Sequence, residues 1–368
     1  MSTQLNELHF THANEHAFHD ALKQASHNYI NSKNDHVYAS KKDIFLIISM
    51  IVLAIICYIP TLLTSSTVVY IAGYVGFVLL IMLLNVLGQH DACHNILFKQ
   101  TWLNRIFGRL VTLPLGLEPE FWRVRHVYFH HRYANIEHYD LDTEENGIFR
   151  QTPFQNWRPM MKYQHVYWPI VASFSLTWIA LVFDWSDRTG KTPLKSRKVL
   201  EGKLGWALFL GSKICHLLLM LGLPLWVAHL HGIDIMTILL TYLASQMVAS
   251  LFVVYLLLGT HWAETAFFEA PNNQQMPHGW YYHNFVTACD WLPSPTWLWR
   301  LTGGLNYHLT HHLFPGWHHR HYPALAAIIA RLAKQYDLPY RCISYRQLLD
   351  AQIRFLRKMG EAPSDRSH

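Results

Sequence analysis

The sequence predicts an all-α integral membrane protein, with four transmembrane helices in two hairpins and a cytoplasmic helical cap. Three observations predict this fold class. The chain of 368 residues is 51% hydrophobic, and its apolar residues are concentrated in four long runs. Basic residues gather at one end of those runs, and three histidine clusters lie outside them. A hydrophobic run of about 20 residues is long enough to cross a bilayer as a helix.

The four expected spans form two pairs, and each pair is joined by a short polar link. The spans are expected at residues 44–63, 68–87, 204–230 and 235–260. Because the links "TSST" and "HGID" are short, each pair is expected to form a helical hairpin. A further apolar run at residues 166–183 contains Pro169 and several hydroxyl residues. We expect this run to lie in the membrane interface or to enter the bilayer partway, and not to form a fifth span.

The placement of basic residues predicts the orientation. Lys41 and Lys42 precede the first span, a cluster of Lys and Arg from Arg188 to Lys203 precedes the third, and neither link carries one. Cytoplasmic loops hold the excess of Lys and Arg. The cytoplasmic segments are therefore expected to be residues 1–42, 88–203 and 261–368. We expect a single domain, residues 1–368, in the inner cell membrane, with both termini in the cytoplasm.

The net charge of +6 is explained by basic residues that face anionic lipid headgroups. A docking face for an acidic redox partner is a second interpretation, and no nucleic-acid-binding motif is present. The five cysteines are scattered without a C-x2-C pair, which is typical of a reducing compartment without a disulfide framework.

Three helices are expected outside the spans. Residues 13–30 place Phe18, Leu22 and Tyr29 at helical spacing, which indicates an amphipathic surface helix. A second helix is expected at residues 323–336. A third begins after a capping box at Ser344 and Gln347 and ends at Gly360; it is expected to bury Leu348, Leu349, Ile353 and Leu356.

Three histidine boxes are the most specific feature of the sequence. The first box holds His90 and His94, the second holds His126, His130 and His131, and the third holds His308, His311 and His312. Residues three or four apart share one face of a helix, so each box can direct several ring nitrogens at one point. Eight imidazoles exceed what one ion needs, which indicates a histidine-rich site for two metal ions in the cap. Imidazole ligands alone suit iron, zinc or copper.

The boxes and their flanks resemble the integral-membrane fatty acid desaturases, of the bacterial acyl-CoA or acyl-lipid type. The matching segments are "GQHDACH" from Gly88, "WRVRHVYFHHRYANI" from Trp122, "WRP" from Trp157, "YQHVY" from Tyr163, and "GGLNYHLTHHLFP" from Gly303. The resemblance extends over about residues 10–340.

This resemblance implies a di-iron centre that uses O2 to introduce a double bond into a fatty acyl chain. The eight box histidines are then iron ligands, and His261, in "LGTHWAET" after the fourth span, is the expected ninth. Asp91, Asn135, Asp140 and Asp142 are candidates to accept hydrogen bonds from ligand imidazoles, with helix capping as the alternative. His283 is a further candidate near the metal site or the substrate. His318, His319 and His321 are expected on a polar surface or at lipid headgroups, and not as metal ligands.

The expected substrate is a fatty acyl-CoA or an acyl-lipid, drawn from the membrane. The sequence lacks the His-Pro-Gly-Gly signature of a fused haem domain, so electrons are expected from a separate ferredoxin or flavin reductase.

Two other functions remain open. A hydroxylase, ketolase or alkane-oxidising enzyme on the same scaffold also begins with hydrogen abstraction. A histidine-rich metal transporter belongs to a different class, but transporters place ligands near the bilayer midplane inside spans. Here the spans hold few ionisable residues beyond Lys213, His216 and His229.

Overall fold

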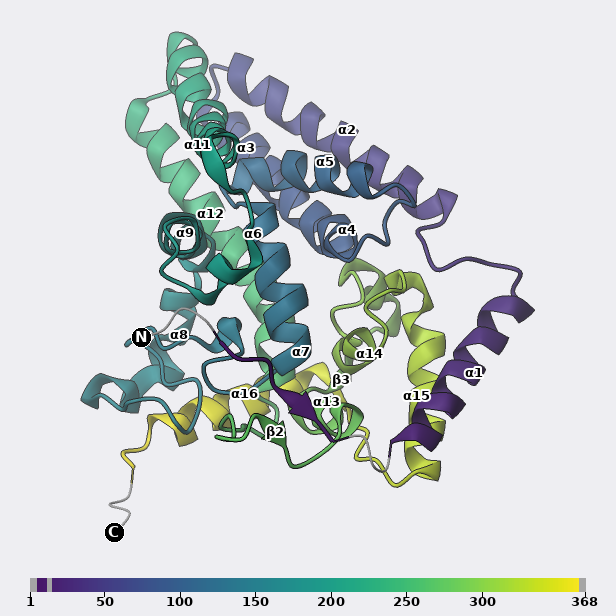
Figure 1. Ribbon diagram of the computed structural model, residues 1–368. Helices are drawn as coiled ribbons and strands as arrows, with labels where there is room; N and C mark the ends of the chain where they lie inside the picture. Colours follow the sequence, from purple (N-terminus) through teal and green to yellow (C-terminus); the bar gives the residue numbers. More distant parts are fainter. Residues whose placement is uncertain (1–4, 12–14, 364–368) are drawn as a thin grey trace. The chain divides into compact units, whose positions relative to one another are not determined.

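The computed structural model describes residues 5–11 and 15–363 (Figure 1). The described residues are mostly helical, and their strands form two short parallel pairs. β1 (His9–Phe10) pairs with β2 (Gln275–Met276), and β3 (Asp290–Leu292) pairs with β4 (Cys342–Ser344). The contacts divide the chain into two compact units. The first comprises Ala39–Val124 and Pro169–Val254, and the second comprises Leu5–Tyr38, Arg125–Trp168 and the chain from Tyr255 onward.

Four helices are long and apolar enough to cross a membrane, which confirms the prediction of four spans. They are Lys41–Leu63, Thr67–Cys93, Gly202–Ala228 and Ile235–His261. The first is α2 (Lys41–Leu63). The second joins α3 (Thr67–Leu84), the π-helix η1 (Asn85–Gln89) and α4 (His90–Cys93). The third joins α11 (Gly202–Leu217) to the π-helices η8 (Leu218–Gly222) and η9 (Pro224–Ala228). The fourth joins α12 (Ile235–Leu257) to η10 (Leu258–His261).

The first hairpin is set by its caps and by a close approach of its helices. Ser40 and Asp43 form a capping box at the start of α2, which satisfies amide groups that have no partner within the helix. The α2 and α3 helices pack together, and a Cβ added at Gly73 would clash with Thr61. The Tyr74 hydroxyl donates to the carbonyl of Met220 at 2.6 Å, which satisfies a carbonyl of the π-helix η8.

The run that we expected at the membrane interface is bent. The segments Pro159–Ala172 and Ser175–Arg188 meet at 79°, so the structure has five spans only if this bent pair is one of them. The pieces are η5 (Pro159–Tyr163), α8 (Gln164–Ala172), α9 (Ser175–Trp178), η6 (Ile179–Phe183) and α10 (Asp184–Arg188). Pro169 lies in α8 just before the bend, where its ring cannot donate a helical hydrogen bond.

Short elements of the first unit precede the bent run and follow it. These are α5 (Thr101–Thr112), η2 (Leu113–Leu115), α6 (Pro119–Val124) and η7 (Pro193–Arg197). Gly108 of α5 faces Gln89: a Cβ there would lie 2.5 Å from the Gln89 Oε1 atom. Similarly, a Cβ at Gly88 would lie 2.8 Å from the Phe107 ring. The helix that ends in the first box is therefore pressed closely against α5.

The second unit holds the expected surface helices. α1 (His16–Ser32) runs beside α15 (Tyr322–Gln335), although the two are distant in sequence (Figure 1). Phe18 and Leu22 of α1 are buried against a core that includes Phe285. Residues 13 and 14 of the helix that we expected at 13–30 lie outside the described residues.

The C-terminal helix α16 (Tyr345–Gly360) begins with the predicted Ser344–Gln347 capping box. Leu348 and Leu356 are buried, whereas Leu349 and Ile353 are only half-buried. The remaining elements of this unit carry or flank the histidine boxes: η3 (Arg125–His130), α7 (His131–Tyr133), η4 (Leu141–Thr143), α13 (Trp280–Thr287), η11 (Thr296–Leu301), α14 (His308–Leu313) and η12 (His319–His321).

Candidate metal centre

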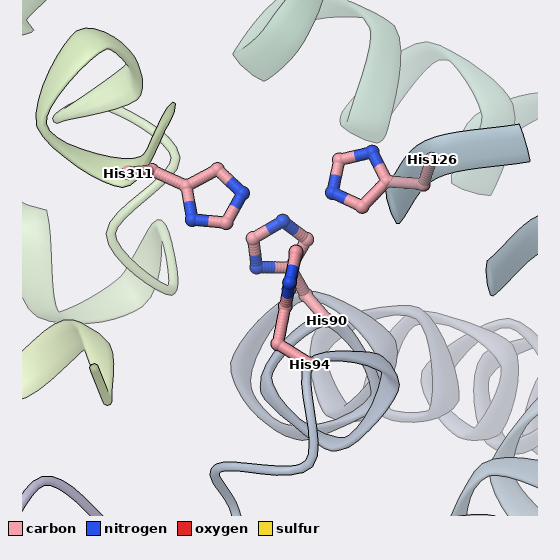
Figure 2. Close-up of side chains that lie close together, drawn as sticks. All are labelled: His90, His94, His126 and His311. Carbon is pink, nitrogen blue, oxygen red and sulfur yellow. The ribbon is translucent and has the colours of Figure 1, made fainter. Parts of the chain in front are cut away.

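The first box ends the second span. His90 opens α4 directly after the π-helix η1, and His94 is the C-cap of that short helix. Their rings lie 5.4 Å apart in an edge-to-face arrangement, and Figure 2 shows both rising from the same helical segment. A π-helical turn widens the helix by one residue and is frequent at functional sites. It sets the direction in which both imidazoles leave the end of the span.

The second box also lies on a π-helix. His126 and His130 belong to η3, and their rings stack at 17° with centroids 5.6 Å apart. His131 follows in α7, and its Nε2 atom lies 3.1 Å from the Nε2 atom of His126. Arg125 anchors the segment, because its guanidinium donates to the Leu141 carbonyl at 3.2 Å and to the Glu144 carboxylate at 3.1 Å.

The third box lies on one short helix, α14, which an aspartate holds in place. Asp290 accepts hydrogen bonds from the Thr310 amide at 3.1 Å, from the Thr310 hydroxyl at 2.6 Å and from the Tyr340 hydroxyl at 3.0 Å. The His311 Nδ1 atom bonds the Tyr322 hydroxyl at 2.8 Å. All three box histidines are almost completely buried.

Four imidazoles of the second unit converge on one point. They are His130, His261, His308 and His312, and one nitrogen of each lies within 4.8 Å of the nitrogens of the others. His261 Nδ1 donates to the Thr287 carbonyl at 2.8 Å, which leaves its Nε2 lone pair 2.6 Å from the Nε2 atom of His308. Only a proton or a metal ion between these two nitrogens satisfies both lone pairs.

The surroundings of His312 show whether a metal ion fits this cluster. Its side chain is fully buried, and neither ring nitrogen has a hydrogen-bond partner among the described residues. A buried polar group without a partner is costly and rare in proteins. Neutral imidazole is the commonest metal ligand, so a bound ion would give His312 the partner that the protein does not supply. The donor set therefore fits a metal ion.

The remaining box histidines of the second unit lie next to this cluster. The rings of His126 and His311 stack at 10° with centroids 5.7 Å apart, and both are drawn in Figure 2. The His131 ring lies between, with its centroid 4.5 Å from those of His126 and His311 and 4.4 Å from that of His312. The second unit thus brings together His126, His130, His131, His261, His308, His311 and His312.

Burial and neighbouring charges set the protonation of these rings in opposite directions. Burial lowers the pKa of His130, but the Asp140 and Asp142 carboxylates outweigh burial and raise that pKa to about 9. Burial holds the pKa of His312 well below its usual range, and nearby His308 lowers it further. His312 is therefore neutral at pH 7, which is the form that binds a metal ion.

The candidate hydrogen-bond acceptors take different positions. Asp140 lies 3.1 Å from His130 Nδ1, and the half-exposed Asp142 lies 3.5 Å from the same atom. The Asn135 side chain contacts the backbone of His261, and not its ring, by donating to its carbonyl at 3.1 Å. Asp91 is buried next to His90.

His283 is buried, and neither of its ring nitrogens bonds a box imidazole among the described residues. Its Nε2 atom donates to the Ala134 carbonyl at 2.8 Å, and its Nδ1 atom lies 3.0 Å from His278 Nε2. The ring therefore supports the second box through the backbone just after it.

The expected polar surface at His318, His319 and His321 is wrong, because all three are buried. The segment before the first span contacts His318 and His321. His318 donates its amide to the Val37 carbonyl at 2.8 Å, and His321 Nε2 donates to the His36 carbonyl at 3.0 Å. These contacts are long-range, so the local polar pattern could not reveal them.

The chain is similar to known proteins over most of its length. A family model described as fatty acid desaturase matches residues 65–344. An acyl-lipid (8-3)-desaturase of Physcomitrium patens is 30% identical over 279 residues, which cover 74% of this chain and 56% of the moss protein. A sn-1 linoleoyl-lipid 6-desaturase of Synechocystis is 28% identical over 279 residues, covering 74% of this chain and 76% of that protein. Its counterpart in Arthrospira platensis is 27% identical over 286 residues, covering 76% and 75%.

Proposed function

Because the chain belongs to the fatty acid desaturase family, we propose that it is an O2-dependent membrane enzyme that introduces a double bond into a fatty acyl chain. The observation that carries this proposal is the cluster of buried imidazoles around His312, which lacks a protein partner for either ring nitrogen among the described residues. The relatives named above are acyl-lipid desaturases, which favours an acyl-lipid over an acyl-CoA substrate.

The metal in this proposal is a pair of iron ions held by nine histidines. His130, His261, His308 and His312 hold one ion, and the ligands left for the other are His90, His94, His126, His131 and His311. The convergence of the first four within the second unit supports the assignment, as does the resemblance of all three boxes to the family. When bound, the irons supply with O2 the oxidising power to remove two hydrogens from adjacent methylene groups.

The protein's own residues orient the ligands and control what reaches them. Asp140 and the Thr287 carbonyl each accept an Nδ1 proton, from His130 and His261 respectively, so that both rings present Nε2. Burial keeps His312 neutral and excludes water from the site, which limits wasteful side reactions.

In the cell, we place the enzyme in the inner membrane with its termini and histidine boxes on the cytoplasmic side. The basic residues that precede the first and third spans support this orientation. The reduction of O2 to two waters consumes two electrons beyond those taken from the acyl chain. A ferredoxin or a flavin reductase is the proposed source.

Fatty acid analysis of a host that expresses the chain tests the proposal. We expect gas chromatography–mass spectrometry to show a new unsaturated acid that requires O2 and disappears in the His311→Ala variant. The His138→Ala variant is the matched control, because His138 lies seven residues after His131 but its side chain is exposed. A hydroxylated product would replace the proposal with the oxygenase alternative. Product formation under strict anoxia would refute the oxidative reaction.

A further inference from the structure

A groove beside the start of α11 is lined by residues that the metal centre does not use. The groove lies wholly within the first unit and has a volume of about 590 Å³. Its lining comes from Phe121 of α6, from α10, from the chain through η7, and from the first turns of α11. Arg188, Lys195 and Lys198 are its basic residues, and none of them lies near a histidine box in the sequence.

The positive charge of the groove is available to a ligand. Lys195 and Lys198 are exposed, and neither forms an ion pair with any residue that the structure describes. Two carboxylates also line the groove. Asp187 is buried and accepts a hydrogen bond from the Thr192 hydroxyl at 2.6 Å, whereas Glu201 is exposed. Among the residues that the structure describes, the two lysines therefore have no carboxylate partner.

Arg188 is held rigidly in the wall of the groove. Its guanidinium donates to the Leu200 carbonyl at 2.7 Å and to the Gly202 carbonyl at 3.4 Å, and it lies 4.0 Å above the Trp206 ring. Two carbonyls use only part of the five donors of a guanidinium, and the planar fork matches phosphate geometry. The stacking on tryptophan and the carbonyl contacts fix the charge before a ligand arrives.

The start of α11 adds an electrostatic environment that is favourable for an anion. The Glu201 side chain makes no capping hydrogen bond, and a Cβ added at Gly202 would have no atom within 4 Å. The first turn of this helix therefore borders open space, and the positive end of the helix dipole lies on the same side as the basic residues.

The apolar residues next to the groove indicate what kind of anion it takes. Leu204 and Trp206, in the first two turns of the third span, are 72% and 39% exposed. A soluble anion has no apolar part that could contact these side chains. A membrane lipid can place its phosphate among the basic residues and its acyl chains along the apolar helix. We propose that this groove binds the phosphate-bearing headgroup of an anionic membrane lipid.

The general excess of Lys and Arg at cytoplasmic span ends does not explain why Lys195 and Lys198 line the groove. Lys191 and Lys203 belong to the same basic segment and contribute equally to that excess, but they do not line the groove. They provide a control in which the same charge is removed from the same stretch of chain.

The test compares lipid binding by two double variants of the purified full-length chain in non-ionic detergent. Native mass spectrometry measures the dissociation constants for phosphatidylglycerol and phosphatidylcholine. The test variant is Lys195→Gln/Lys198→Gln, and the control is Lys191→Gln/Lys203→Gln. A basic side chain near an anionic surface contributes about fivefold to affinity. We expect wild type to prefer phosphatidylglycerol, the test variant to lose about 25-fold in affinity for it, and the control to lose less than about threefold.

Three results would overturn the proposal. One is a wild-type protein that binds the two lipids equally, and another is equal loss in the two double variants, which would reduce the effect to general charge. The third is displacement of phosphatidylglycerol by inorganic phosphate at the same concentration, which would show a site for small anions and not for a lipid. The measurement needs neither iron nor activity, so it stands or falls independently of the proposed function.

Discussion

Asp140 accepts the Nδ1 proton of His130 at 3.1 Å, and the same carboxylate accepts the backbone amide of Asn135 at 2.9 Å. One buried side chain thereby links an imidazole of the histidine cluster to the turn that follows the second box. With Nδ1 bonded to the carboxylate, Nε2 is the nitrogen of His130 left for a metal ion, which would displace the proton that the raised pKa keeps on the ring at pH 7. The carboxylate also makes the ring a more basic ligand.

The first prediction follows from this contact. Asp140→Asn removes the negative charge and can present an amide N–H to Nδ1, so the His130 ring loses its fixed tautomer. We expect iron affinity to fall by about 10- to 100-fold, measured as iron retained during titration with a chelator. Asp142→Asn is the matched control, because Asp142 lies 3.5 Å from the same atom but is 49% exposed. Equal iron loss in both variants would contradict a specific role for Asp140.

The second prediction concerns His261, which the box pattern alone does not contain. Its Nδ1 atom is bonded to the Thr287 carbonyl and its Nε2 atom faces the cluster. We expect His261→Ala to lose fatty acid product and to bind less than the full complement of iron, measured by elemental analysis of the purified protein. His229→Ala, at an exposed histidine near the end of the third span, should keep both. Wild-type iron content in His261→Ala would remove this residue from the ligand set.

The sequence was sufficient to predict the four spans, because a helix in a bilayer must be long and apolar regardless of its neighbours. The C-terminal helix was equally predictable from the Ser344–Gln347 capping box, which acts within one turn. The histidine boxes were found by their spacing, and the second unit brings six of their eight members together with His261.

Other features depend on contacts that spacing does not encode. The π-helices before His90 and through His126 change which side chains share a face, and nothing in their residues marks an extra residue per turn. Asp290 steadies the third box by bonding Thr310, 20 positions later in the chain. The burial of His318 and His321 depends on the distant segment at His36 and Val37.

The third prediction tests how the loop that carries His261 is held. The Asn135 amide donates to the carbonyls of His261 at 3.1 Å and Ala266 at 3.0 Å, and its backbone has a φ of 57°. Asn135→Ala leaves two buried carbonyls without this donor and places alanine in a strained conformation. We expect a loss of about 2–4 kcal/mol in stability, seen as a lower thermal midpoint in detergent.

Asn135→Gly separates the two causes. Glycine lacks the amide but adopts a positive φ without strain, so it should recover about 1 kcal/mol relative to alanine. An alanine variant as stable as wild type would show that the amide contacts do not hold the loop. Equal stability of the alanine and glycine variants would assign the whole loss to the hydrogen bonds.

The fourth prediction concerns a buried ion pair in the first unit. The Lys213 ammonium donates to Asp184 at 2.6 Å, and also to the carbonyls of Gly116 at 2.6 Å and Ala180 at 3.0 Å. Asp184 in turn accepts the amide of Glu118 at 2.9 Å. This network ties the third span to α10 and to the turn before α6. Lys213→Met leaves the Asp184 carboxylate buried without its cation, which costs about 3–5 kcal/mol in comparable pairs.

The double variant Lys213→Met/Asp184→Asn shows whether the cost comes from the stranded charge. With both charges removed, only neutral contacts are lost, so the double variant should be more stable than Lys213→Met alone. Thermal midpoints in detergent of wild type, Lys213→Met, Asp184→Asn and the double variant give the coupling between the two residues. Additive losses would mean that the two side chains act independently. In that case the lysine would stabilise the fold through the Gly116 and Ala180 carbonyls, and not through its charge.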